Sequence, residues 1–324
     1  GFYARIRNPV RLGMAHTRQT LEGYSTEGRA GLAARAERQT NRHRGFGAQT
    51  WVGGGIRWLV TTATRYLDPA LWDGGGTVEA ESWIRSEQRR GAWTVRGGVS
   101  AAGGVEYRNR GAGLSTEDAY DAQPYLRLTG EATARRDFGR YRIGFRGYAG
   151  WVESSRRPLK QRQLFVAGAD PYQQFSNPFL RSRGALLAGA DVHYHMPGGG
   201  NVRGLAAGTS ATRLVAVTAE ADRAVFSQAE RGPSARTRTR LFGEIRVAAF
   251  GDAALGNGDV PLPGRSAALV ADAGAGIRIG HRIGPTPFVT RFDFPVVVSR
   301  PRLAAQETGG IVRFRWVVSA EAAF

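Results

Sequence analysis

The sequence predicts an all-β protein, a transmembrane antiparallel β-barrel of about 16 strands, with about 14 as the alternative. Three observations predict it. Apolar and polar residues alternate with a period of two over many segments, tight turns alternate with long polar connections, and no run of about 18 apolar residues could form a membrane helix. We expect residues 1–324 to form a single barrel, and its setting to be the bacterial outer membrane.

Residues 93–108 show the alternation most clearly. One face carries Val95 and Val105, whereas the other carries Glu106 and Arg108. Because successive side chains of a strand point to opposite faces, this segment has one face that suits lipid and one that suits water. Outer-membrane barrels have this arrangement along every strand.

The same alternation recurs at 126–134 and 141–151, which are joined by the short connection 136–140. The connection 109–123 is long and polar, as one side of an outer-membrane barrel requires. Acidic residues lie opposite apolar positions and among arginines, which predicts cross-strand ion pairs on the inner wall. These acids are Glu106, Glu131, Glu244 and Glu321.

The last segment, 311–324, alternates apolar residues with Arg313 and Arg315. A soluble β-sandwich would alternate in the same way, with its apolar side buried. Glycine and alanine at many apolar positions, with aromatic residues near the segment ends, favour a lipid-facing surface instead. The segment ends on Phe324, which resembles the terminal signal of barrel precursors; the alternative is an ordinary edge strand.

The formal net charge is +18, and Lys160 is the only lysine among 45 basic residues. The arginines are spread over strand-like segments, which favours a basic lumen and basic rims facing anionic lipid and lipopolysaccharide, and argues against nucleic acid. There is no cysteine, no HExxH, GxSxG or P-loop motif, and the glycines at 53–57 lie in a strand-like segment. We therefore expect no cofactor and no enzyme activity.

Four stretches stand out in the second half: 163–169 (QLFVAGA) with 198–205 (GGGNVRGL), 248–254 (AAFGDAA), 273–294 and 312–324. Together they resemble, over about 164–324, the barrel of the outer-membrane assembly superfamily, the group that includes BamA, TamA and the two-partner secretion transporters. Five strand-like segments follow Arg203, as in the family: 211–226, 237–252, 267–282, 288–299 and 311–324.

The resemblance implies that residues 164–205 form a loop that folds into the lumen. Arg203 and Gly204 would lie at its tip, and Asp252, Glu220 and Asp293 would hold the arginine against the wall. A buried guanidinium needs such carboxylate partners. The alternative is an exposed arginine beside flexible glycines. The chain departs from the family in Leu205, which replaces an aromatic residue, and in an insertion over 169–197.

His193 and His195 flank Tyr194 within this insertion. Their spacing places both on one face of a strand, where they would bind a metal if a third ligand approached. No third ligand is evident in the sequence, and the alternative is a pair of solvated loop histidines, so we expect no metal.

The resemblance implies a role in inserting or translocating polypeptides, with client polypeptides or subunits of an assembly machinery as partners. A labile pair of edge strands would let a client strand add to the sheet. Two alternatives stay open: a barrel that anchors or exports a larger module, and a passive pore. No signal peptide is visible at Gly1, which indicates a mature chain or one part of a longer protein.

Overall fold

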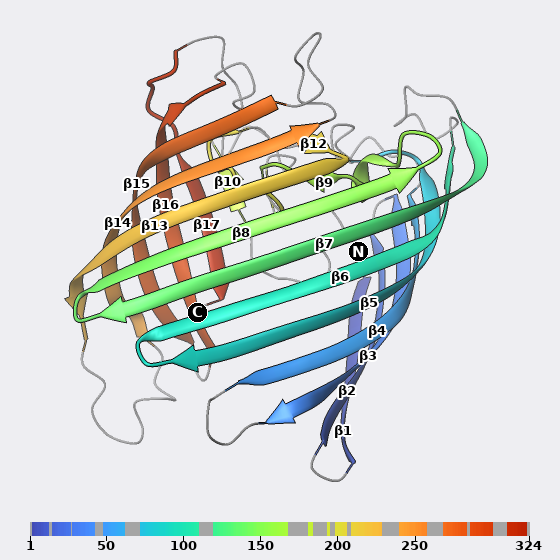
Figure 1. Ribbon diagram of the computed structural model, residues 1–324, viewed down its shortest axis with the longest axis horizontal. Coiled ribbons are helices and arrows are strands. Elements are labelled where there is room, and N and C mark those ends of the chain that lie inside the picture. The colour runs from blue at the N-terminus through green and yellow to red at the C-terminus, as the bar shows by residue number, and fades with distance from the viewer. Residues whose placement is uncertain are drawn as a thin grey trace. The chain divides into compact units, whose positions relative to one another are not determined.

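The computed structural model is almost entirely β-structure (Figure 1). Its fifteen-stranded sheet is close to the roughly 16 strands expected. No helix in the described part of the chain is long and apolar enough to cross a membrane. The structure describes residues 2–12, 15–26, 28–42, 48–61, 72–109, 119–167, 181–183, 193–194, 198–205, 209–228, 240–257, 268–283, 286–300 and 310–322.

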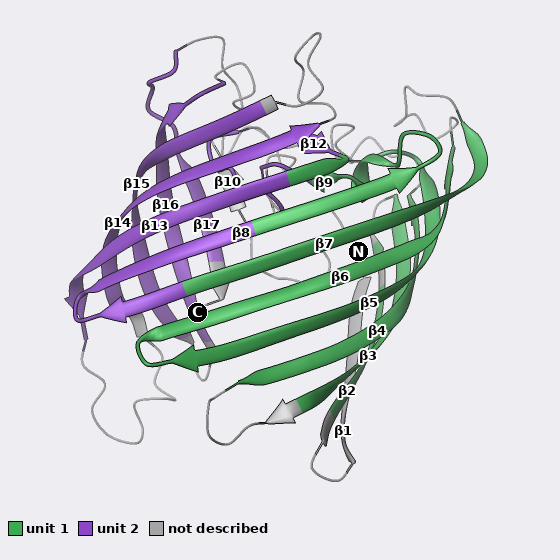
Figure 2. Cartoon of the chain, viewed as in Figure 1, with its two compact units in different colours: residues 1–134, 148–164, 212–214 green, residues 135–147, 165–211, 215–324 purple. Residues whose placement is uncertain are grey.

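The chain divides into two compact units, shown in different colours in Figure 2. Unit 1 consists of residues 1–134, 148–164 and 212–214. Unit 2 consists of residues 135–147, 165–211 and 215–324.

Unit 1 contains long strands that are sheet neighbours in chain order, and each described pairing from β1 to β6 is antiparallel. They are β1 (Phe2–Leu12), β2 (Ala15–Thr26), β3 (Arg29–Arg42), β4 (Gln49–Thr61), β5 (Gly75–Arg90), β6 (Trp93–Arg108) and most of β7 (Tyr120–Phe138), followed by part of β8 (Tyr141–Ser154) and the short 3₁₀ helix η2 (Lys160–Arg162). β6 has the bounds expected from the alternation, and β7 begins at Tyr120, within the connection expected over 109–123.

Besides the end of β7 and the beginning of β8, within residues 135–147, unit 2 contains four long strands, then a shorter one, and several very short ones. They are β9 (Leu164–Phe165, of which Leu164 belongs to unit 1), β10 (Arg181–Arg183), β11 (His193–Tyr194), β12 (Ser210–Ala211), β13 (Arg213–Ser227, from Val215 on), β14 (Arg240–Asn257), β15 (Ala268–Ile283), β16 (Thr286–Val298) and β17 (Val317–Ala322). Their order in the sheet is β13, β14, β15, β16, β17, β10, β11, whereas β9 pairs with β12.

The two faces of the sheet in unit 1 differ sharply in polarity. Ile56 in β4 and Val78 in β5 are 65% and 60% exposed, although both are apolar. On the opposite face Glu79 and Glu106 are buried. A protein dissolved in water normally buries its apolar residues and exposes its charges.

Unit 2 has the same inverted pattern. Val215 and Val217 on β13 are exposed, whereas Asp222 on the same strand and Asp252 on β14 are buried. A soluble sandwich would bury its apolar side, so this inversion argues against that alternative. The inversion is the one that a lipid environment selects.

The last strand is shorter than the sequence predicted. β17 begins at Val317, and the backbone of the preceding residues pairs with β16 only at the isolated bridge between Val297 and Val312. Pro295 in β16 has no N–H to donate, and the β15–β16 register shifts at this point, which is typical of a bulge. The expectation of one continuous strand over 311–324 is therefore wrong.

Cross-strand ion pairs do cover the polar face of unit 1, but not through all the expected acids. Arg57 contacts Glu79 at 3.0 Å and Glu81 at 2.6 Å. Glu106 instead accepts neutral hydrogen bonds, and Glu244 pairs within its own strand with Arg246, at 2.6 Å. Alternation identifies the face that a carboxylate occupies; its partner depends on the register between strands.

Candidate functional site

Backbone hydrogen bonds hold the two ends of segment 164–205 side by side. Gly200 donates to the carbonyl oxygen of Phe165 at 2.8 Å, and Val202 donates to that of Val166 at 3.0 Å. A side chain at Gly200 would place its Cβ 2.6 Å from the Val166 carbonyl oxygen, so only glycine allows this approach. The tip of the segment is therefore fixed beside its beginning.

The chain turns sharply just before Arg203. Gly199 and Asn201 have φ angles of 53° and 55°, in the left-handed region that glycine and asparagine tolerate best. The glycine-rich sequence before Arg203 is therefore needed for the shape of the tip.

Arg203 is 1% exposed and is bound by Asp252 of β14 through two parallel hydrogen bonds. Its Nε donates to Asp252 Oδ2 at 2.7 Å, and its Nη2 donates to Oδ1 at 3.0 Å. The guanidinium carbon also lies 3.7 Å from the centre of the Phe250 ring. Two-point binding and stacking both use the planarity of arginine, which lysine lacks.

Two further acids complete the surroundings of the guanidinium. Arg203 Nη1 lies 3.0 Å from Glu220 Oε2 on β13 and 3.4 Å from Asp293 Oδ1 on β16. Burial disfavours the charge of Arg203, but Asp252 and then Asp293 more than offset it, so the pKa of Arg203 is raised well above its ordinary value. The arginine is thus held in its charged form.

Gly204 adds a backbone contact to a fourth acid. Its N–H donates to Asp272 Oδ2 of β15 at 2.5 Å. A Cβ at this position would lie 2.5 Å from Val298 Cγ2 and 3.1 Å from Asp272 Oδ2, so the tip fits closely against the wall. The bulge at Pro295 brings both Asp293 and Val298 to the buried face.

The strand register explains why the wall receives this tip. Asp252 and Asp272 lie directly opposite each other between β14 and β15, where like charges repel. The tip gives each acid its own donor, Arg203 for Asp252 and the Gly204 N–H for Asp272. The wall therefore presents a pair of acids, each of which accepts a hydrogen bond from the loop tip.

A second like-charge pair lies next to the first. Arg278 of β15 and Arg291 of β16 are also register partners. Glu220 bridges them, since its Oε2 lies 2.9 Å from Arg278 Nη2 and 2.5 Å from Arg291 Nη2. Asp293 Oδ1 lies 2.6 Å from Arg278 Nη1. The result is one connected cluster of three guanidiniums and four carboxyl groups, which we call the tip cluster: Arg203, Glu220, Asp252, Asp272, Arg278, Arg291 and Asp293.

The structure brings together Arg203, Gly204, Asp252, Glu220 and Asp293, the five residues that the sequence singled out for the loop tip. The expected assembly signal, Phe324, lies outside the described residues, as does His195. His193 lies in β11, where only the backbone is described. Among the described residues, no three His, Cys, Asp or Glu side chains are arranged so that they could hold a metal ion.

Sequence reasoning missed Asp272, Arg278 and Arg291. Strand alternation within 267–282 places Asp272 and Arg278 on one face, and alternation within 288–299 places Arg291 and Asp293 on one face. The pattern therefore contained a signal for the face of these residues, but not for the register that places them opposite one another.

A second docked segment, also missed, belongs to unit 1. Residues 157–163, which we call the strap, lie against β5 and β6. Arg162 is buried, with its Nη1 2.9 Å from Glu79 Oε2 and its Nη2 2.8 Å from Thr77 Oγ1. The Lys160 N–H donates to Asp73 Oδ2 at 2.9 Å. The docked part of the chain therefore begins before residue 164, the start expected from the resemblance.

The strap also contacts a buried carboxyl group. Glu106 accepts hydrogen bonds from Gln123 Nε2 at 2.6 Å, from Tyr120 Oη at 2.9 Å and from the Leu159 N–H at 3.3 Å. The side chains of Glu106 and Arg162 are both almost inaccessible to water. Polar groups that water cannot reach need hydrogen-bond partners within the protein, and these partners give the strap a defined position on unit 1.

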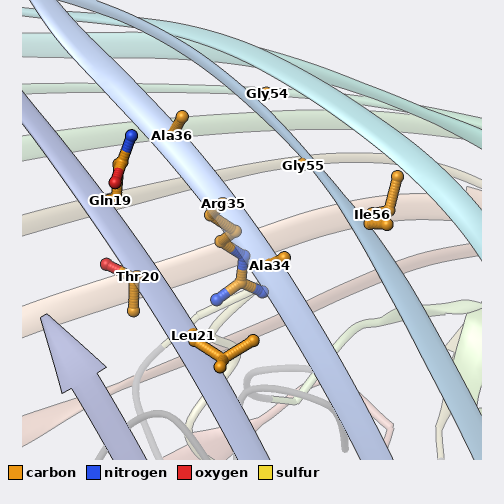
Figure 3. Close-up of a pocket in the computed structure, with 9 residues that line it drawn as sticks. All are labelled: Gln19, Thr20, Leu21, Ala34, Arg35, Ala36, Gly54, Gly55 and Ile56. Atoms are coloured by element: carbon orange, nitrogen blue, oxygen red, sulfur yellow. The ribbon is translucent and has the colours of Figure 1, made fainter.

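A hollow of about 620 Å³ lies over β2, β3 and β4 in unit 1 (Figure 3). Small residues such as Ala34, Ala36 and Gly54 line it between Leu21 and Ile56. These side-chain positions are on the exposed apolar face, and the guanidinium of neighbouring Arg35 bonds Glu81 on the polar face. The hollow therefore has the character of a lipid-facing surface and not of a polar ligand site.

No family model and no curated protein matches the sequence. In structure the chain is similar to CdiB from Escherichia coli, with a TM-score of 0.51 and 12% identity, over 98% of this chain and 48% of CdiB. It is also similar to BamA from Haemophilus ducreyi lacking POTRA domains 1–3, with a TM-score of 0.46 and 11% identity, over 98% of this chain and 66% of that one. The chain spans about half the length of CdiB.

The likeness to CdiB, at 12% identity, shows the fold alone, an antiparallel β-barrel. The exposed apolar faces of both units agree with this fold, because the outside of such a barrel contacts lipid. The chain thus has the fold of a β-barrel with exposed apolar faces that suit a lipid bilayer.

Proposed function

We propose that the chain is the membrane barrel of a protein that inserts or translocates polypeptides at the outer membrane. The observation that carries the proposal is the tip cluster. The cluster binds the loop tip to four acids of the wall, so the segment that carries the tip has a fixed position. In the proposed role the pinned segment 164–205 restricts the lumen and braces the wall while the sheet opens elsewhere.

The partners follow from the two faces of the sheet. The apolar face contacts outer-membrane lipid. Exposed arginines near the strand ends, such as Arg89 and Arg90 of β5, contact phosphates of lipid and lipopolysaccharide. The client is a polypeptide in extended form, which binds through backbone hydrogen bonds to a strand edge. Neither step needs a bound cofactor or metal.

A second candidate role is the anchoring or export of a larger module. Its support is the coverage of CdiB, of which this chain matches 48%. In this role the barrel has no effect on unrelated clients and acts only on the polypeptide joined to it.

The test is the folding rate of a small, unfolded outer-membrane barrel added to vesicles that contain this chain. We expect faster folding of the client than in vesicles with an unrelated barrel at equal density, which controls for bilayer disturbance. Folding is followed by the shift in gel mobility of the client before and after heating.

The test variant is Arg203→Ala, which removes the tip contact. The matched control is Arg89→Ala, which removes an arginine side chain that is 72% exposed. Loss of the acceleration in Arg203→Ala alone supports a role for the pinned loop. Equal folding rates in all vesicles, including those with the unrelated barrel, would contradict the insertion role and leave the anchor.

A further inference from the structure

The insertion that the family loop lacks supplies a strand to the edge of β17. On one side β17 pairs with β16, from Asp293 opposite Val317 to Phe288 opposite Ala322. On its other side it pairs with β10, within residues 169–197 of the insertion (Figure 1). The three β10 pairs, all antiparallel, are Arg181 with Ser319, Ser182 with Val318, and Arg183 with Val317.

The position of β10 has a physical reason. A strand edge presents backbone N–H and C=O groups that bind any extended chain within reach. β10 satisfies this edge over Val317–Ser319, and β11 in turn pairs with β10, with Ser182 opposite His193. Three residue pairs are few for a stable strand, since strands usually contain about five or six residues.

The tip holds β10 close to this edge in spite of the short pairing. Residues 165–166 and 200–202, on the two sides of the insertion, are joined by the hydrogen bonds from Gly200 and Val202. Arg203 then fixes this junction to the wall. A strand tethered at both ends has a high effective concentration at its partner, so a weak pairing forms and also opens readily.

We propose that β10 is a built-in occupant of the β17 edge, and that an extended strand of another polypeptide takes its place. The pairing of β10 with β17 is inferred from their strand register alone. The replacement of β10 by another polypeptide rests also on the proposed function. Val317 and Ser319 are buried on the polar face and Val318 is on the other face. A strand in the β10 register would therefore place polar residues opposite Val317 and Ser319 and an apolar residue opposite Val318, which is the alternation of an outer-membrane strand.

The pairing is tested by disulfide formation, which is free of background because the chain has no cysteine. In the full chain refolded into vesicles, Ser182→Cys with Val318→Cys should form a disulfide readily, as should Phe292→Cys with Val318→Cys, a directly paired set within β16 and β17. His193→Cys with Val318→Cys is the matched control. It should oxidise at least about tenfold more slowly, because two strand spacings separate these positions by roughly 10 Å.

Failure of the 182–318 pair to form a disulfide while the 292–318 pair forms one would overturn the pairing. A fast 193–318 disulfide would overturn the register. Both results are independent of any client, so they separate this inference from the insertion role.

The exchange is tested with Val318→Cys alone and a synthetic peptide of the β13 sequence, residues 213–223, with cysteine in place of Val217, a residue of the exposed apolar face. Ser182→Pro removes the N–H of the central β10 residue, whereas Ser182→Ala keeps it. We expect the yield of mixed disulfide between peptide and chain to rise several-fold in Ser182→Pro and not in Ser182→Ala. A scrambled peptide should form little mixed disulfide with either variant.

Equal capture of the peptide in Ser182→Pro and Ser182→Ala would overturn the exchange, even if the 182–318 disulfide forms. Capture that rises as expected while client folding in vesicles is not accelerated would support the exchange and contradict the insertion role. The two proposals thus fail separately.

Discussion

Arg203 and Asp252 form a two-point ion pair from which water is excluded. The two hydrogen bonds measure 2.7 and 3.0 Å, and the side chains are 1% and 0% exposed. Both groups lose their hydration when the loop docks, so the pair contributes more to specificity of position than to net stability. Removing one of the two side chains, however, leaves the charge of the other buried without its ion-pair partner.

Replacement of Arg203 by alanine should therefore destabilise the folded barrel by about 3–5 kcal/mol, the usual cost of breaking a buried pair. Arg203→Lys should recover only a minority of this loss, because an ammonium group neither binds Asp252 at two points nor stacks on Phe250 in the same way. Urea unfolding followed by tryptophan fluorescence measures the difference. A lysine variant as stable as the original chain would show that charge alone matters.

Asp272→Asn should have opposite effects in two backgrounds. In the original chain the amide oxygen still accepts the hydrogen bond from the Gly204 N–H, so we expect a loss below about 1 kcal/mol. In the Arg203→Ala background the same change removes one of two facing carboxylates and should recover about 1 kcal/mol. A double-mutant cycle on unfolding free energies checks this sign reversal, and simple additivity would contradict it.

Gly204→Ala tests the close approach of the tip to the wall. Its Cβ would lie 2.5 Å from Val298 Cγ2, so we expect a loss of about 1–3 kcal/mol from overpacking. Val298→Ala removes that methyl group, and the double variant should be more stable than the sum of the single losses predicts. If the losses instead add, the contact with Asp272 Oδ2, at 3.1 Å, is the more important one.

The alternation of residues was sufficient to predict the strands and their faces. β6 has the expected bounds, and Val95 and Glu106 lie on the exposed and buried faces as expected. Side-chain direction alternates along a regular strand, so it is readable from one sequence wherever no bulge interrupts the alternation, as one does at Pro295. The break before β17 was not predicted, because it depends on where Pro295 lies relative to the neighbouring strand.

The tip residues came from the resemblance, and the residues around them required the register. Nothing in the local sequence places Asp272 opposite Asp252, or Arg278 opposite Arg291, because pairings between strands are set by the whole sheet. The strap was missed for a similar reason: Arg162 and Glu79 are 83 residues apart in the numbering and meet only in the folded chain.

Arg162→Ala and Lys160→Ala should differ in their effect although both remove a cation from the strap. The side chain of Arg162 is 3% exposed and contacts Glu79, which is 1% exposed, whereas that of Lys160 is 22% exposed and lies 3.9 Å from Asp73. We expect a loss of about 3–5 kcal/mol for the first and below about 1 kcal/mol for the second. Equal losses in urea unfolding would contradict a buried clamp at Arg162.

Single-channel conductance in a planar bilayer distinguishes a restricted barrel from an open pore. If segment 164–205 is pinned in the lumen, the original chain should show small, flickering conductance. Arg203→Ala should raise the mean conductance and the frequency of opening, because the tip loses its ionic contacts with Glu220, Asp252 and Asp293. Arg89→Ala, an exposed arginine, serves as the control and should leave the trace unchanged. Large, steady conductance that is the same in all three proteins would mean that the pinned tip does not restrict the lumen, and would favour the passive pore.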